Sequence, residues 1–214
     1  MNFIKGHRRS IRLKGYDYSQ QGAYFVTICS HDRECLFGEI VDGKMVLNDV
    51  GKIVETCWHN IPNNFPNAEL DAFVVMPNHV HGIICIVGAP LAGAQNAGAQ
   101  NGTQNNRAPA RGAPTVGDIV GAYKSLCVHN CLKWIKQNEP DRVLGKFWQR
   151  NYYEHVIRNE KSLDQIREYI INNPANWQGD EMNPAVRAPL AGAPNNATNT
   201  TRATARVAPT GDKP

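Results

Sequence analysis

Two histidines one residue apart, His79 and His81, open an apolar run within MPNHVHGII, residues 76–84. The run predicts a β-strand, and because side chains alternate across a strand, both imidazoles project from the same face. Neighbours on one face lie about 6 to 7 Å apart at Cα, close enough to share one metal ion. Two hydrogen-bonded histidines on a half-exposed strand would give the same pattern, so the pair alone leaves both interpretations open.

A second pair of chemically capable residues lies in a predicted helix near the C-terminus. Tyr169 and Asn173 are four residues apart and therefore share a helix face. Leu163, Ile166 and Ile170 form the adjoining apolar stripe, which would seat the helix on a sheet. If this face meets the histidine face, a metal ion gains an amide oxygen, and a phenol stands beside it. A core tyrosine and a helix-ending asparagine are the alternative.

The elements that must position these residues follow a readable order. β-Branched and aromatic runs predict strands, Asp42-Gly43 predicts a hairpin, and apolar residues at helical spacing predict three helices. Strands are expected at 23–30, 68–77, 79–87 and 146–157, and helices at 50–61, 115–138 and 159–173. This order predicts an α+β fold, a ferredoxin-like sandwich with helices mainly on one face of an antiparallel sheet, plus the C-terminal helix that carries Tyr169.

Three segments differ in composition from this core. Residues 1–22 form a basic arm, with five basic and no acidic residues among the first sixteen. Residues 88–114 and 181–214 are rich in small and polar residues and cannot bury enough apolar surface to offset their ordering entropy. The sequence thus predicts one catalytic domain at 23–180, a disordered insertion at 88–114 and a disordered tail at 181–214.

Bulk properties narrow the classes of protein. Apolar residues make up 42% of the 214, but none of the runs approaches the roughly 18 to 20 that a membrane helix requires. The N-terminal segment lacks the apolar stretch of a secretory signal, so we expect a cytoplasmic protein.

Six cysteines without a CxxC motif are expected to be reduced and mostly buried, and a zinc site at Cys127 and Cys131 lacks a second ligand pair. The net charge of +4 is concentrated in the basic arm, which suits a polyanionic partner, although a solvated terminus would have the same composition.

Four blocks of the sequence resemble one known family. MPNHVHGII resembles the HUH motif of nucleases that act on single strands, and FWQRNYYEHVIRNEKSLDQIREYIINNP resembles the C-terminal signature of the REP-associated tyrosine transposases. The segments RRSIRLKGYDYSQQGAYFVTICS and TVGDIVGAYKS are similar to that family as well. The resemblance runs from about residue 8 to residue 177, interrupted by residues 88–114.

The resemblance implies a metal-dependent single-strand DNA endonuclease and strand transferase that forms a 5′-phosphotyrosine intermediate. Position by position, Tyr169 matches the nucleophile, His79 and His81 two metal ligands, and Asn173 the third. The implied cofactor is Mg²⁺ or Mn²⁺, which suit mixed nitrogen and oxygen ligands. The residues expected to contact DNA are Arg8, Arg9, Arg12, Lys124, Arg150, His155 and Arg158, with Trp148, Tyr152 and Tyr153 as residues that stack on bases or pack in the core.

The implied partner is single-stranded DNA with hairpin, repetitive palindromic elements, bound by a monomer or a homodimer near the nucleoid and away from any membrane. Two other functions stay open at this point. One is a catalytically silent DNA-hairpin-binding protein derived from a transposase. The other is a ferredoxin-like RNA-binding module, against which the strand AYFVTICS lacks the glycine-rich aromatic signature.

Overall fold

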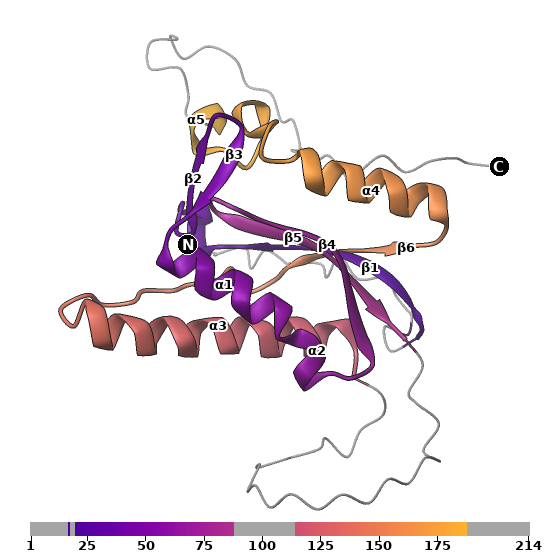
Figure 1. The fold of residues 1–214 in the computed structure, drawn as a ribbon, viewed down its shortest axis with the longest axis horizontal. Coiled ribbons are helices and arrows are strands. Elements are labelled where there is room, and N and C mark those ends of the chain that lie inside the picture. The colour runs from indigo at the N-terminus through magenta and orange to yellow at the C-terminus, as the bar shows by residue number, and fades with distance from the viewer. Residues whose placement is uncertain (1–16, 18–19, 88–113, 188–214) are drawn as a thin grey trace, which may run out of the picture.

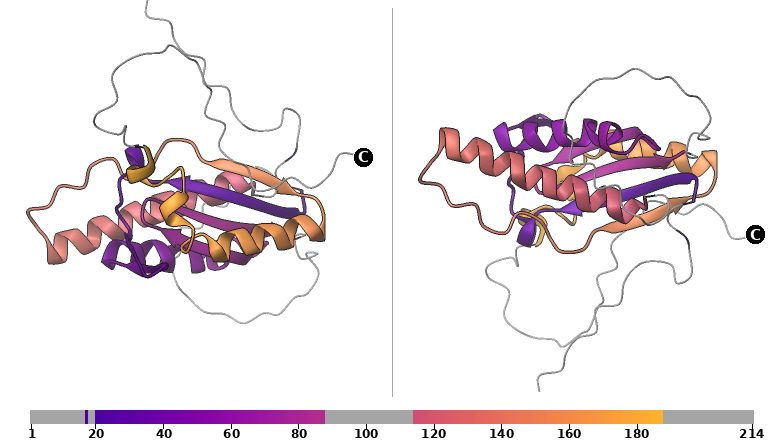
Figure 2. Two further views of the ribbon diagram at one scale, coloured as in Figure 1. Left: turned by 90° about the horizontal axis from the view of Figure 1, so that it is seen from above. Right: turned by 90° about the horizontal axis from the view of Figure 1, so that it is seen from below.

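The computed structural model of this chain describes residues 17, 20–87 and 114–187 (Figure 1). Their centre is a four-stranded antiparallel sheet in the order β4-β5-β1-β6. The strands are β1 (Gly22–Cys29), β4 (Ala68–Met76), β5 (His79–Ile86) and β6 (Tyr153–Ile157). Two helices cover one face of this sheet and a third covers the other (Figures 1 and 2), so the predicted α+β fold class is confirmed.

β1 is the strand that joins the two halves of the sheet. Its β-branched and aromatic residues suit a pleated surface buried on both sides, and it pairs with β5 on one edge and β6 on the other. Thr27 lies opposite His81, and Cys29 lies opposite His79. Because facing residues of an antiparallel pair project to the same side, all four side chains lie on one face of the sheet.

The helices α1 (Asp49–His59) and α3 (Val116–Asn138) cover the other face. Asn48 caps the first helix by accepting from the Gly51 amide, and Thr115 with Asp118 forms a capping box at the second. Their apolar stripes bury a large core against the even-numbered residues of β1 and β5, such as Val26 and Ile84. This layer contains most of the apolar burial of the described residues.

The helix α4 (Glu160–Asn172) lies on the histidine side of the sheet, and Figure 2 shows it on the opposite side from α3. Asn159 caps it by accepting from the Ser162 amide. Ile166 and Ile170 are fully buried against Phe25 and Ile83 in a second, smaller apolar cluster. The predicted stripe therefore seats this helix on the sheet.

The predicted hairpin is also present, as a separate two-stranded sheet of β2 (Gly38–Val41) and β3 (Lys44–Leu47). Asp42 and Gly43 both have positive φ, of 50° and 71°, as a tight two-residue turn requires. The hairpin tip reaches the segment after α4, where Ala175 lies beside Gly43.

The structure differs from the sequence-based expectations at the last strand. Residues 146–152 were expected to extend it, but β6 begins only at Tyr153. The preceding segment instead wraps around the end of β1, where Trp148 forms an isolated bridge with Ser30 and the Gln149 amide donates to the Cys29 carbonyl. Four short helices were not anticipated: η1 (His31–Arg33), α2 (Ile61–Asn64), η2 (Trp177–Gly179) and α5 (Pro184–Arg187).

The described chain continues past residue 180, where the predicted tail begins, to residue 187. The Met182 carbonyl accepts a hydrogen bond from Asn78, so this segment is packed against the start of β5. Residues 88–113 of the predicted insertion and most of the predicted arm and tail lie outside the described residues. Among the described helices, none has the length and apolar character needed to cross a membrane.

Candidate active site

His79 and His81 lie at the beginning of β5 and are buried, with 0% and 3% of their surfaces exposed. Their Nε2 atoms are 3.0 Å apart. Two nitrogen ligands of one ion, each about 2.1 Å from it at a right angle, are about 3 Å apart. The pair therefore has the spacing of two ligands that converge on one ion.

Asn78 fixes the orientation of His79. Its Nδ2 donates to the carbonyls of Arg33 (3.0 Å) and Met182 (2.8 Å), which leaves its Oδ1 facing His79 Nδ1 at 2.8 Å. An amide oxygen only accepts, so Nδ1 of His79 must carry the proton. Its Nε2 consequently presents a lone pair toward His81.

Thr27 plays the corresponding part for His81, with its hydroxyl 2.9 Å from Nδ1. Since His79 Nε2 is an acceptor, the 3.0 Å contact between the rings requires a proton on His81 Nε2. His81 Nδ1 then accepts from the threonine hydroxyl. To offer Nε2 to a cation, His81 must move its proton to Nδ1, and Thr27 can accept it because a hydroxyl both donates and accepts.

Tyr169 brings its hydroxyl to 3.4 Å from His81 Nε2. Its ring meets His81 and Phe25 edge-on, with centroid distances of 5.3 and 6.1 Å. Phe25 in turn stacks on the His81 ring at 5.3 Å. The face of α4 and the histidine face of β5 thus meet at the phenol, as the sequence-based hypothesis requires.

Asn173 caps the end of α4, one turn beyond the tyrosine. Its side chain is buried, with 3% of the residue exposed, and lies beside the Tyr169 phenol. Its Oδ1 has no hydrogen-bond partner among the described residues. A buried amide oxygen without a donor is costly, and a cation would satisfy it.

These donors fit a divalent cation. Burial lowers the pKa of His79 well below its usual value and that of His81 to about 3, so both imidazoles are neutral at physiological pH and able to ligate. With Asn173 Oδ1, the third ligand that the resemblance implies, they would give two nitrogens and one oxygen, all uncharged. Among the described residues, no group of three or more His, Cys, Asp or Glu side chains is suited to a metal, so a third protein ligand would be of another type, such as this amide.

The phenol of Tyr169 is protonated in this environment. Burial raises its pKa, the neighbouring Asn173 side chain lowers it, and the Asp180 carboxylate raises it further. Nucleophilic use of this oxygen therefore needs a positive charge nearby or an acceptor for its proton.

The structure does not bring every predicted DNA-contacting residue to this site. Lys124 lies on α3, where its ammonium donates to the carbonyls of Gln149 (2.9 Å), Asn151 (3.3 Å) and Arg150 (3.4 Å). Burial lowers its pKa to about 8. The Lys124 side chain therefore anchors residues 149–151, the segment just before β6, to α3.

The other predicted contacts are distributed along the β6 edge. His155 lies opposite Phe25 in the β1–β6 register and therefore projects to the same face of the sheet as His79 and His81. Burial lowers the pKa of His155, and the nearby positive charge of Arg158 lowers it further. Arg150, which precedes β6 in the sequence, and Arg158, which follows it, are both exposed. The predicted contacts Arg8, Arg9 and Arg12 lie outside the described residues.

The aromatic residues near β6 divide between the two faces. Tyr153 lies on the histidine side and meets Phe25 edge-on at 6.4 Å, so it can stack with a base there. Tyr152 donates to Glu154 (2.7 Å), and the Trp148 indole donates to the Lys124 carbonyl (3.2 Å). These two therefore pack in the fold and do not reach the tyrosine.

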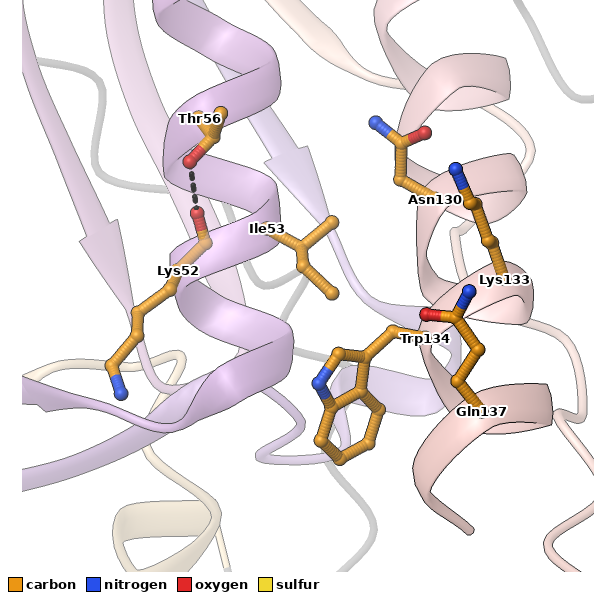
Figure 3. Close-up of a pocket in the computed structure, with 7 residues that line it drawn as sticks. All are labelled: Lys52, Ile53, Thr56, Asn130, Lys133, Trp134 and Gln137. Atoms are coloured by element: carbon orange, nitrogen blue, oxygen red, sulfur yellow. Dashed lines mark hydrogen bonds between the residues drawn. The ribbon is translucent and has the colours of Figure 1, made fainter. Parts of the chain in front are cut away.

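Figure 3 shows a different hollow, between α1 and α3, in which Trp134 projects toward Ile53 and the amides of Asn130 and Gln137 line the α3 side. It encloses about 350 Å³. Because these helices cover the face away from His79, this hollow is separate from the candidate active site.

Sequence reasoning missed Thr27, Asn78 and Phe25 as parts of the site. Asn78 adjoins the histidine motif, so its position was a usable signal. Thr27 and Phe25 become neighbours of His81 only through the β1–β5 register, which the strand pattern alone does not specify.

The fold and site define a class: a ferredoxin-like α+β protein whose buried histidine pair faces a tyrosine on a helix. None of the protein-family models searched matches the sequence. A protein of Haemophilus influenzae strain Rd, itself uncharacterized, is 46% identical over 177 residues, which span 82% of this chain and 93% of the relative. The chain belongs to one family with that protein.

Two solved structures are similar in fold. A REP-associated tyrosine transposase bound to a REP hairpin has 18% sequence identity and a TM-score of 0.48, with 91% of this chain and 99% of the other covered. A candidate transposase of Deinococcus radiodurans R1 has 19% identity and a TM-score of 0.39, with 75% and 95% covered.

Proposed function

We propose that this protein is a metal-dependent single-strand DNA endonuclease and strand transferase of the tyrosine transposase type. The observation that carries the proposal is the placement of the Tyr169 hydroxyl 3.4 Å from His81 Nε2, beside a histidine pair with 3.0 Å between its Nε2 atoms. The resemblance of four sequence blocks to the REP-associated tyrosine transposases supports the same activity.

His79, His81 and Asn173 would hold Mg²⁺ or Mn²⁺. When bound, the ion would withdraw charge from the scissile phosphate and oppose the burial that keeps the phenol protonated. Since all three ligands are uncharged, the full positive charge of the site remains available to a phosphodiester.

Tyr169 supplies the nucleophile. Its oxygen forms a bond to phosphorus, the bond from phosphorus to the 3′ oxygen of the preceding nucleotide breaks, and the phenolic proton leaves as that oxygen becomes a 3′-OH. A phenol, with a pKa of about 10, is both a workable nucleophile and a good leaving group. A 3′-OH can therefore attack the 5′-phosphotyrosine and rejoin strands without an external energy source.

The proposed substrate is single-stranded DNA that carries a hairpin. The similar transposase structure contains a REP hairpin, and the predicted basic arm, with Arg8, Arg9 and Arg12, suits the phosphates of a stem. Tyr153 and His155 lie on the sheet face that α4 covers, which supports a role for them in contacting unpaired nucleotides that lead into the site.

The test is incubation with labelled hairpin DNA and Mn²⁺ or Mg²⁺, followed by a denaturing gel. We expect a covalent protein–DNA band that disappears with Tyr169→Phe and persists with Tyr153→Phe. Cleavage that survives Tyr169→Phe would contradict the nucleophile assignment.

The same assay separates the enzyme from a silent hairpin-binding protein. We expect His79→Ala and His81→Ala to abolish cleavage while hairpin binding persists in a gel-shift assay. Wild-type binding without any cleavage in either metal would favour the silent binder.

A further inference from the structure

Three cysteine side chains gather where α1 packs on α3, on the face of the sheet away from the histidines. Cys57 lies on α1, and Cys127 and Cys131 lie one turn apart on α3; all three are buried and none forms a disulfide. The Cys127 thiol lies close enough to the Cys57 sulfur for the two to perturb each other's pKa. The proposed DNA chemistry uses neither.

The two thiols have unlike surroundings. The Asn130 amide donates to the Cys57 sulfur at 3.3 Å, and the Cys127 thiol is placed to donate as well. The Cys127 contact and the Asn130 hydrogen bond outweigh burial and lower the pKa of Cys57 to about 7. Burial raises the pKa of Cys127 well above its usual value, so this residue remains a thiol.

A small molecule can reach Cys57 from one side. Although only 1% of the residue is exposed, it lines a cavity of about 420 Å³ between α1, α2 and α3. Leu126 and Phe65 form part of the apolar wall. A cavity of this size admits a small hydroperoxide but restricts bulky thiol reagents.

We infer that Cys57 and Cys127 form a peroxide-reactive pair, with Cys57 as the attacking residue and Cys127 as the resolving one. The Cys57 thiolate attacks one oxygen of hydrogen peroxide, the O–O bond breaks, and the released hydroxide takes up a proton to leave as water. The resulting sulfenic acid is attacked by the Cys127 sulfur, which loses its proton as a second water leaves. In sum, two thiols and one peroxide yield one disulfide and two waters.

The disulfide would join α1 covalently to α3. Both helices belong to the large apolar layer, so the bond constrains the unfolded chain and is expected to raise the midpoint of thermal unfolding. The inference stands independently of the DNA-cleaving activity, since both sulfurs lie on the other side of the sheet.

The test is treatment of the reduced full-length protein with hydrogen peroxide, followed by alkylation and mass spectrometry. We expect loss of two hydrogen atoms and a peptide that links Cys57 to Cys127. Cys127→Ser should stop at a sulfenic acid on Cys57, trapped by dimedone, whereas Cys35→Ser, at an exposed site, should leave the linked peptide unchanged.

Asn130→Leu provides a second variant that retains both thiols. Loss of the donated hydrogen bond should slow oxidation of Cys57 by roughly tenfold, because the thiolate is the reactive form. Circular dichroism establishes that each variant is folded. Dimedone on Cys35 alone, or a disulfide that joins Cys127 to Cys131, would overturn the inference.

Discussion

His79 and His81 are held at Nδ1 by different kinds of partner, and this difference governs how the pair can act. The amide oxygen of Asn78 accepts only, so it commits His79 to one tautomer. The hydroxyl of Thr27 donates or accepts, so it allows His81 to exchange tautomers when a cation replaces the contact between the rings. One ring is fixed and the other is adaptable.

We predict that Thr27→Val lowers the affinity for Mn²⁺ by about tenfold, because a protonated Nδ1 of His81 would lose its buried acceptor. Isothermal titration calorimetry measures the affinity directly. Thr27→Ser is the matched control and should retain near wild-type binding, since it keeps the hydroxyl. Equal affinities for the valine and serine variants would show that Thr27 does not orient the ring.

At the scale of elements, α4 is attached to the sheet by few contacts for a helix that carries the proposed nucleophile. Its buried cluster is small, and an ion pair between Arg167 and Asp71 of β4 supplements it, with Nη2 to Oδ2 at 2.6 Å. The Arg167 guanidinium holds the pKa of Asp71 below its usual value. Arg167 lies two residues before Tyr169 on α4, so we expect this ion pair to help hold the phenol in place.

We predict that Asp71→Asn lowers kcat by up to about tenfold with little change in DNA affinity, because the tyrosine is held less firmly. Single-turnover cleavage and gel-shift titrations separate the two quantities. Lys52→Gln is a control, since the Lys52–Asp49 pair is an exposed pair within α1. A fall in affinity at unchanged kcat would contradict a positioning role.

The strand β5 carries a second positional requirement one residue past the histidine pair. A Cβ at Gly82 would overlap the Trp58 indole, which is fully buried and stacked on Phe73 with 4.7 Å between the ring centroids. The glycine after the motif is thus needed for packing on the face away from the site.

We predict that Gly82→Ala destabilises the protein by about 2 kcal/mol, since the tryptophan must shift within a packed core. Urea unfolding monitored by fluorescence measures the change. Gly121→Ala is the control: its Cβ would meet nothing within 4 Å, so that variant should be neutral or slightly stabilising. An unchanged stability of Gly82→Ala would mean that Trp58 and α1 can shift to accommodate the methyl group at little cost in free energy.

At the scale of the whole molecule, the three main helices, the hairpin and the first three strands of the large sheet were predictable, because their apolar periods and turn residues are local signals. The meeting of Tyr169 with His81 followed from helical spacing together with family resemblance. The role of Thr27 was not predictable, because it depends on the register between β1 and β5. The bridge between Trp148 and Ser30, just after β1, was not predictable either, because it joins segments that are distant in the sequence. The predicted tail begins at residue 181, and the described chain continues to residue 187, with the Met182 carbonyl accepting from Asn78.

The buried histidines also make global stability depend on pH. Burial lowers the pKa of both below the ordinary value of 6.5, so the unfolded chain binds more protons in acid. Their contribution is fully present above pH 6.5 and is lost as the pH falls toward the folded values. Between pH 7.5 and 5.0 we predict a loss of roughly 2 to 4 kcal/mol in the free energy of unfolding.

Urea unfolding at the two pH values, with a chelator present, measures this loss. The double variant His79→Leu/His81→Leu should show a much smaller difference, whereas His59→Gln, at an exposed position, should behave like the wild type. A pH dependence that persists in the double variant would assign the effect to other groups.

The direction of β5 has a practical consequence. The strand begins at His79 and ends at Ile86, so the chain leaves the strand about 23 Å from His79. Residues added at this junction enter the protein at the end of the strand remote from the proposed active site. The same junction is therefore a rational place to install an affinity tag or a fluorescent reporter in this protein.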